Sequence, residues 1–155
     1  MGMASMLRTA AVVTSLATLA GCVSVQATSN KQAGAPQGQV KAVYHLTNGL
    51  DEAQRGMGNV RNHLAADPKA KIVVVGNGAG IEFMLDGAKD KNGSAFDATI
   101  ADLKSQGVEF RLCRNTLVTR KIDPSKVNPD VSIVPSGVAE AARLQQQDGY
   151  AYLRP

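Results

Sequence analysis

Five short apolar segments, joined by stretches of helical periodicity, most constrain what this chain can fold into. None shows a long, strict alternation of polar and apolar residues, as is common for strands buried on both faces of a parallel sheet. Strands of this kind, alternating with helices, predict an α/β fold, a three-layer sandwich in which helices cover both faces of a five-stranded parallel sheet. The predicted strands are residues 40–46, 71–75, 108–113, 131–134 and 150–153.

The segments between the predicted strands have the spacing of amphipathic helices. In the first of them, apolar residues recur every three or four positions from Leu50 to Leu64 and so share one helix face. Asn48 is the predicted N-terminal cap of this helix. The other predicted helices are residues 79–87, a helix marked by Phe96, Ile100 and Leu103 that stops at Gly107, residues 115–121, and residues 137–147.

The beginning of the chain has the pattern of a lipoprotein signal peptide, predicted over residues 1–21. Arg8 supplies a positive charge, and the apolar stretch 10–20 is too short to span a bilayer as a helix. It ends in Leu19-Ala20-Gly21-Cys22, the pattern at which bacterial lipoprotein precursors are lipidated and cut. We therefore expect lipidation of Cys22 and a periplasmic protein attached to a membrane.

Two further features bear on location. Val23, rather than Asp, follows the lipidation site and favours the outer membrane. The alternative is cleavage after Ala27, which would leave the protein soluble in the periplasm. Residues 22–39 include a polar stretch rich in Ser, Asn, Gln, Gly and Pro, predicted to be a flexible tether with a reach of roughly 20 Å. The remaining residues, 40–155, have the size of one domain.

The charge pattern argues against a nucleic-acid partner. Lys and Arg number 17 against 13 Asp and Glu, a net charge of +4, and the basic residues form no stripe with interleaved aromatic residues. A metal site is not expected either, since neither histidine has a second His or Cys at ligand spacing. His63 lies on a polar helix face and is expected to be solvated. No cofactor is predicted.

Cys113 is the candidate reactive residue. With Cys22 lipidated, it is the only free thiol, and it lies between a predicted strand and a helix that opens at Asn115 or Thr116. The dipole and free N–H groups of a helix N-terminus favour a thiolate, and the flanking Arg111 and Arg114 could add positive potential. The alternative is that Cys113 is a small buried hydrophobic residue.

Other candidate binding residues also lie at the carboxyl ends of the predicted strands, where sites form in open parallel sheets. His45 could be an acid–base partner of a thiol or a structural residue with satisfied hydrogen bonds. The glycine-rich segment that contains Asn77 and Gly78 could cradle an anion, but it lacks the dinucleotide-binding spacing, so a tight turn is favoured. Ser136 is expected to be a helix cap rather than a nucleophile. The candidate binding set is His45, Asn77, Gly78, Arg111, Asn115 and Ser136.

Two segments, Phe110-Arg111-Leu112-Cys113-Arg114-Asn115-Thr116-Leu117 and Pro135-Ser136-Gly137-Val138-Ala139-Glu140, resemble the DsrE/DsrF-like family, also called YchN-like. The resemblance extends over residues 40–155. It implies a five-stranded parallel sheet between helices and a homo-oligomer, a trimer or hexamer. Some members carry persulfide sulfur on one cysteine, and Cys113 matches that position. The well-understood carriers work in the cytoplasm, so the predicted export is a departure from the family pattern.

The function expected from this resemblance is the handling of sulfane sulfur by a membrane-tethered periplasmic protein. Cys113 would carry the persulfide, and a sulfur donor or acceptor protein would be its partner. The alternative is a non-catalytic oligomeric module that binds a small ligand or a protein. In either role the protein would be a sulfur carrier or a binding protein rather than an enzyme that turns over a substrate.

Overall fold

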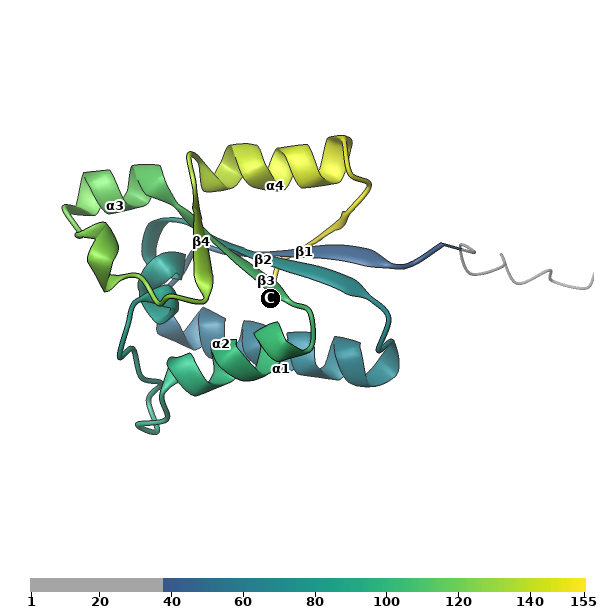
Figure 1. Ribbon diagram of the computed structural model, residues 1–155, viewed down its shortest axis with the longest axis horizontal. Coiled ribbons are helices and arrows are strands. Elements are labelled where there is room, and N and C mark those ends of the chain that lie inside the picture. Colours follow the sequence, from purple (N-terminus) through teal and green to yellow (C-terminus); the bar gives the residue numbers. More distant parts are fainter. Residues whose placement is uncertain (1–37) are drawn as a thin grey trace, which may run out of the picture. The chain divides into compact units, whose positions relative to one another are not determined.

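A parallel sheet of five strands lies at the centre of the part of the chain that the computed structural model describes, residues 38–155 (Figure 1). The strand order is β4-β3-β2-β1-β5, and every neighbouring pair is parallel. Each predicted strand is confirmed to within one residue at each end. The strands are β1 (Lys41–Leu46), β2 (Lys71–Gly76), β3 (Glu109–Cys113), β4 (Val131–Val134) and β5 (Ala151–Leu153).

Helices on both sides of the sheet complete the three layers of the predicted α/β fold. Figure 1 shows α1 and α2 on one side of the sheet and α4 on the other, while the short α3 follows directly on β3. The helices are α1 (Leu50–Ala66), α2 (Phe96–Ser105), α3 (Arg114–Arg120) and α4 (Gly137–Gln146), with 3-10 turns η1 (Gly78–Met84) and η2 (Pro124–Lys126).

The two faces of the sheet bury different amounts of apolar surface. The larger core lies on the face covered by α1 and α2, where Phe83 makes edge-on contacts with Phe96 and Phe110. A smaller core forms where Leu144 packs against Val43 of β1 and against Val73 and Val75 of β2. Because both faces are covered, successive side chains of β1 and β2 are buried, which explains their continuous apolar sequences.

Two local predictions are wrong because contacts distant in sequence override the local pattern. Residues 79–87 do not form an α-helix, because the 3-10 turn η1 packs directly on the end of β1; a Cβ at Gly80 would lie 2.1 Å from the Leu46 carbonyl oxygen. Asn48 does not cap α1, which begins after Gly49. The buried Glu52 instead accepts hydrogen bonds from the Asn48 N–H at 2.7 Å and the Asn48 side chain at 3.0 Å.

Other local predictions are confirmed. Gly107 has the left-handed conformation expected after α2, with φ of 91°. Ser136 caps α4, since its hydroxyl oxygen accepts from the Ala139 N–H at 3.4 Å. His63, however, is half-buried rather than solvated, with Nδ1 3.1 Å from the Tyr44 hydroxyl.

The predicted signal peptide, the lipidation site Cys22 and nearly all of the predicted tether lie outside the described residues. Within residues 38–155, none of the helices has both the length and the apolar character needed to cross a membrane.

Candidate functional site

Cys113 lies where three loops meet at the carboxyl edge of the sheet. It is the last residue of β3 and the residue before α3, and its exposed fraction is 5%. β3 lies between β2 and β4 in the sheet, so the loops that follow all three strands come together at this point. The parallel topology thus places the thiol among backbone groups at helix starts.

Hydrogen bonds determine the acidity of the Cys113 thiol. Burial raises its pKa, but hydrogen bonds to the sulfur outweigh burial and leave the pKa below the ordinary cysteine value. The groups that lower the pKa are the N–H of Gly137, the hydroxyl and N–H of Thr116, and the N–H of Asn115, which also donates to the Pro135 carbonyl at 3.3 Å. Free N–H groups at a helix start were the predicted cause, and they are among the groups that lower the pKa; the flanking arginines, which were expected to add positive potential, are not.

The Thr116 hydroxyl is oriented by a second contact. Its oxygen accepts a hydrogen bond from the Gly78 N–H at 3.0 Å, which leaves its hydrogen free to be donated to the sulfur of Cys113. Thr116 therefore links the loop after β2 to the thiol at the end of β3.

Gly137 brings the N-terminus of α4 against the thiol. A Cβ at this position would lie 3.1 Å from the Cβ of Cys113, 3.1 Å from the Cβ of Asn77 and 3.2 Å from the Gly76 carbonyl oxygen. Only a residue without a side chain fits here without displacing its neighbours. The free N–H groups at the start of the helix then favour negative charge on the sulfur.

Cys113 lines a shallow hollow of about 340 Å³ on the surface. Cys113 and four members of the predicted binding set line this hollow, together with residues that the prediction did not include. The lining residues are Asn77, Gly78, Cys113, Asn115, Thr116, Thr119, Arg120, Ser136 and Val138.

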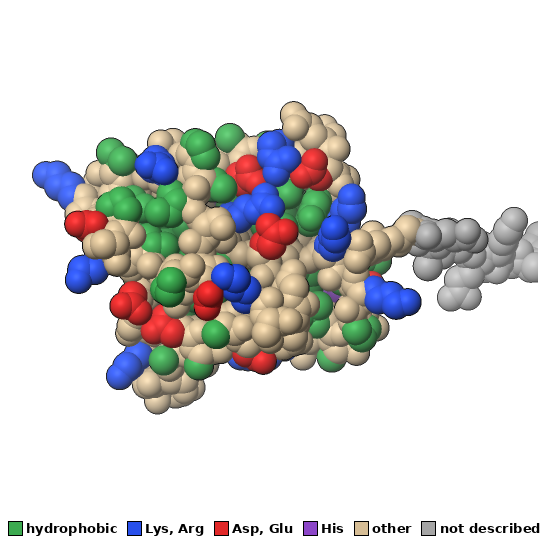
Figure 2. All heavy atoms as spheres, viewed as in Figure 1, with side chains coloured by type: hydrophobic (Ala, Val, Ile, Leu, Met, Phe, Trp, Pro, Cys, Tyr) green, Lys and Arg blue, Asp and Glu red, His purple; other side chains and the backbone are tan. Residues whose placement is uncertain are grey.

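Arg111 does not line the hollow. Its guanidinium forms an ion pair with Glu109 at 2.6 Å and another with Glu140 on α4. Glu140 is also 2.8 Å from Arg143, and hydrogen bonds from Arg143 and Arg111 hold the pKa of the Glu140 carboxyl below its usual value despite burial. Figure 2 shows basic and acidic side chains interleaved around α4. The ion pair between Arg111 and Glu140 thus connects β3 to α4.

His45 also lies outside the hollow and reaches it only through Asn77. Its exposed fraction is 6%. Its Nδ1 is 2.8 Å from the Tyr152 hydroxyl, and its Nε2 is 2.7 Å from Asn77 Oδ1. His45 is therefore not a direct acid–base partner of the thiol in this arrangement.

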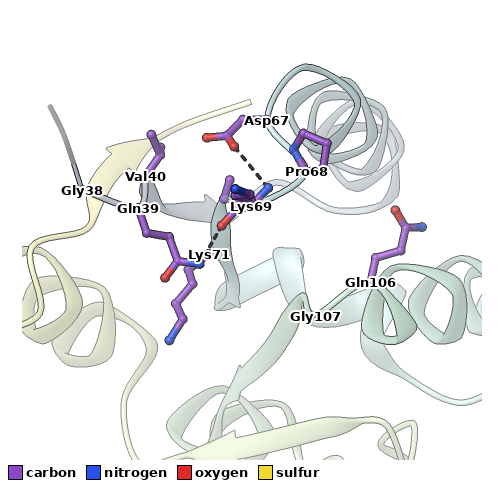
Figure 3. Close-up of a pocket in the computed structure, with 10 residues that line it drawn as sticks. Gly38, Gln39, Val40, Asp67, Pro68, Lys69, Lys71, Gln106 and Gly107 are labelled. Carbon is purple, nitrogen blue, oxygen red and sulfur yellow. Dashed lines mark hydrogen bonds between the residues drawn. The ribbon is translucent and has the colours of Figure 1, made fainter. Parts of the chain in front are cut away.

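A larger hollow, of about 590 Å³, lies at the opposite, amino edge of the sheet (Figure 3). There Gln39 Nε2 donates to the Lys69 carbonyl at 2.7 Å, and the Lys69 N–H donates to Asp67 Oδ1 at 3.2 Å. Neither a cysteine nor a histidine is among its described lining residues, so it offers no nucleophile comparable to Cys113. Within residues 38–155, moreover, no group of three His, Cys, Asp or Glu side chains could hold a metal ion.

Sequence reasoning missed two residues that contact the thiol, Thr116 and Gly137. The glycine directly after the Ser136 cap was a usable signal, because a glycine at the start of a helix often permits close approach of another group. Thr116 gave no comparable signal, since its role depends on the loop after β2.

Comparisons with known proteins identify the family and agree with the fold. The profile of the DsrE/DsrF-like family matches residues 41–155. A solved structure of a protein of unknown function, MTH1491 from Methanobacterium thermoautotrophicum, is similar with a TM-score of 0.66 and 29% identity, over 76% of this chain and 100% of that one. The ychN protein from E. coli has a TM-score of 0.62 over 75% of this chain and 100% of that one, and at 15% identity this likeness shows the fold alone. No curated protein sequence matches the chain.

Proposed function

Because the chain belongs to the DsrE/DsrF-like family, we propose that it carries sulfane sulfur as a persulfide on Cys113. The family indicates a role related to sulfur relay. The observation that carries the finer proposal is the set of N–H and hydroxyl groups that lowers the pKa of the Cys113 thiol, which lines an open hollow. The thiolate is the nucleophile in sulfur exchange, so a lowered pKa increases the reactive fraction at neutral pH.

The transfer step is an exchange between sulfur atoms. The Cys113 thiolate attacks the outer sulfur of a persulfide donor, R–S–SH, and a new S–S bond forms on Cys113. The S–S bond of the donor breaks, and its electron pair leaves with the thiolate RS⁻. No external oxidant is consumed, and the reverse reaction delivers the sulfur to an acceptor thiolate.

Intact-mass measurement after incubation with polysulfide tests this proposal. We expect the protein to gain the mass of one sulfur atom, to lose it on treatment with a reducing thiol, and to gain none as the Cys113→Ser variant. A wild-type protein that gains no sulfur would contradict the carrier function and favour the alternative of a non-catalytic module that binds a small ligand or a protein.

The proposed location is the periplasmic face of the outer membrane, with attachment through lipidated Cys22. The support is the sequence Leu19-Ala20-Gly21-Cys22 and the polar segment that follows it. The Cys22→Ala variant should fail to be processed or should leave the membrane fraction, as fractionation and intact mass would show. A native protein that begins at Thr28 and is absent from membranes would refute the anchor.

The proposed assembly is a homo-oligomer, a trimer or hexamer, held by apolar contacts. Among the described residues, large hydrophobic side chains remain exposed on α3 and α4, with Val118 71% and Val138 58% exposed. Such side chains on neighbouring helices are suited to contact with another subunit. A sulfur donor or acceptor protein would be a further, transient partner.

A further inference from the structure

A chain of hydrogen bonds runs from the edge of the sheet to the hollow that contains Cys113. Tyr152 on the edge strand β5 contacts the buried His45, and His45 contacts Asn77, which lines the hollow. None of these three side chains is among the groups that lower the pKa of Cys113. Their role is therefore separate from stabilising the thiolate itself.

These hydrogen bonds determine how the Asn77 carboxamide is oriented. A carbonyl oxygen can only accept, so His45 Nε2 carries the hydrogen that Asn77 Oδ1 accepts at 2.7 Å. On the other side of the ring, Nδ1 lies 2.8 Å from the Tyr152 hydroxyl, which holds the ring in place. The backbone of Asn77 is held as well, since its N–H donates to the Leu46 carbonyl at 3.1 Å.

With its oxygen engaged, Asn77 has one side-chain group left, the NH₂ of the same planar carboxamide. Within residues 38–155 no acceptor is bonded to this nitrogen. The Cβ atoms of Asn77 and Cys113 border the same point, because each lies 3.1 Å from the position that a Cβ of Gly137 would take. A persulfide would extend the Cys113 side chain by an S–S bond of roughly 2 Å into the hollow between them.

We propose that Asn77 recognises the transferred sulfur: its NH₂ group donates a hydrogen bond to the terminal sulfur of the Cys113 persulfide. This inference rests on the proposed carrier function. His45 and Tyr152 are positioning residues, which act by holding the Asn77 oxygen away from the sulfur. The arrangement divides the donors, since Gly137, Thr116 and Asn115 serve the inner sulfur and Asn77 serves the outer one. It favours an anionic terminal sulfur over an uncharged alkyl group at that position.

The test is the equilibrium of sulfur exchange between the protein and glutathione persulfide in the presence of glutathione, measured by intact mass. In Asn77→Ala, the equilibrium constant for loading Cys113 should fall about tenfold, the effect of losing one hydrogen bond to a charged group. The rate of alkylation of the sulfur-free thiol against pH should keep its midpoint, because Asn77 is not among the groups that lower the pKa of Cys113.

Two variants of His45 distinguish a role in positioning Asn77 from a general loss of folded structure. His45→Gln keeps an N–H donor for Asn77 and should load nearly as well as the wild type, whereas His45→Leu should show the loss seen in Asn77→Ala. Tyr152→Phe removes only a hydroxyl from a partly exposed residue, and it should weaken loading a few-fold even if His45→Leu does not fold.

The outcomes are distinguishable. A wild-type protein that takes no sulfur overturns the carrier function and this inference together. A wild type that loads, alongside an Asn77→Ala variant that loads equally well, overturns the role of Asn77 alone. An Asn77→Ala variant whose alkylation midpoint rises by about one pH unit, while its loading constant falls about tenfold, also overturns it. Asn77 would then act on the inner sulfur.

Discussion

At the residue scale, the chemistry of Cys113 depends on donors from three segments that are far apart in the sequence. The Thr116 hydroxyl belongs to α3, the Gly137 N–H to α4, and the Gly78 N–H that orients Thr116 to the start of η1. The Thr116 and Gly137 donors stabilise the charged sulfur more than the neutral thiol, so each contributes to the lowered pKa, whereas the Gly78 N–H acts only through Thr116. Hydrogen bonds to charged groups contribute about 1.5–3 kcal/mol each.

Thr116→Val tests the hydroxyl donor. Valine keeps the shape of the side chain but cannot donate, so the midpoint of the alkylation rate of Cys113 should rise by about one pH unit, since one unit corresponds to about 1.4 kcal/mol. The matched control is Thr119→Val on the same helix, because the Thr119 hydroxyl donates to the Asn115 carbonyl at 2.8 Å instead. Equal midpoints in the two variants would show that the hydroxyl has no effect on the sulfur.

The lowered pKa of Cys113 also predicts how stability changes with pH. Because the pKa is lower in the folded than in the unfolded protein, the thiolate adds stability that is fully present above the ordinary cysteine pKa of about 8.5. This contribution is lost as the pH falls through the lowered folded value. The excess in the free energy of unfolding of the wild type over Cys113→Ser should therefore be larger at about pH 9 than at about pH 6. Urea denaturation measures it, and an equal difference at both pH values would contradict the lowered pKa.

At the element scale, the site depends on how closely α4 approaches β3. Gly137 permits the contact, and the ion pairs of Arg111 with Glu109 and Glu140 hold the helix on the strand. Glu140 lies one turn after Gly137, and Arg111 lies two residues before Cys113. The charged cluster is therefore placed to maintain the distance between the N–H donor and the sulfur.

Gly137→Ala tests this approach. The added methyl group would contact the Cβ atoms of Asn77 and Cys113 at 3.1 Å and should displace the start of α4. We expect a loss of about 1–3 kcal/mol in the free energy of unfolding, together with a higher alkylation midpoint for Cys113. The control is Gly58→Ala in α1, where a Cβ meets nothing within 4 Å. That variant should gain about 0.5–1 kcal/mol, because alanine is a better helix former. A neutral Gly137→Ala variant with an unchanged midpoint would contradict the proposed contact.

At the scale of the whole molecule, exposed apolar side chains predict how subunits assemble. Hydrophobic side chains gather over α3 and the segment that follows it, on the left of the view in Figure 2. Val118 lies in this region and is 71% exposed. A charge placed in an apolar subunit contact costs more than one placed at a solvated surface.

We therefore expect Val118→Asp to reduce the oligomer mass measured by light scattering. Val40→Asp is the control, since Val40 is 39% exposed and lies at the amino edge of the sheet. Reducing agent should leave the wild-type mass unchanged, because Cys113 is buried and the contact is apolar. A wild type that is monomeric at micromolar concentration would refute the assembly, and equal masses for the two variants would place the contact elsewhere.

The sequence by itself determined the parts of this protein that depend on near neighbours. Short runs of apolar residues identified all five strands, and the signal is clearest in β1 and β2, where burial on both faces removes polar residues. Ser136 and Gly107 were identified as helix ends, because caps depend on the conformation of a few consecutive residues. Cys113 was placed correctly between a strand and a helix for the same reason.

The tertiary structure alone decided what surrounds that cysteine. The Gly137 N–H belongs to a helix that begins 24 residues after Cys113, and only the neighbouring positions of β3 and β4 bring the two together. Arg111 was expected near the thiol, but Glu109 and Glu140 hold its charge. Asn77 lines the hollow, and its side chain is held there by a hydrogen bond with His45, 32 residues earlier in the chain. Local patterns record which face of an element is buried, whereas the partners across the sheet follow from strand order and crossover connections, which no short stretch of sequence specifies.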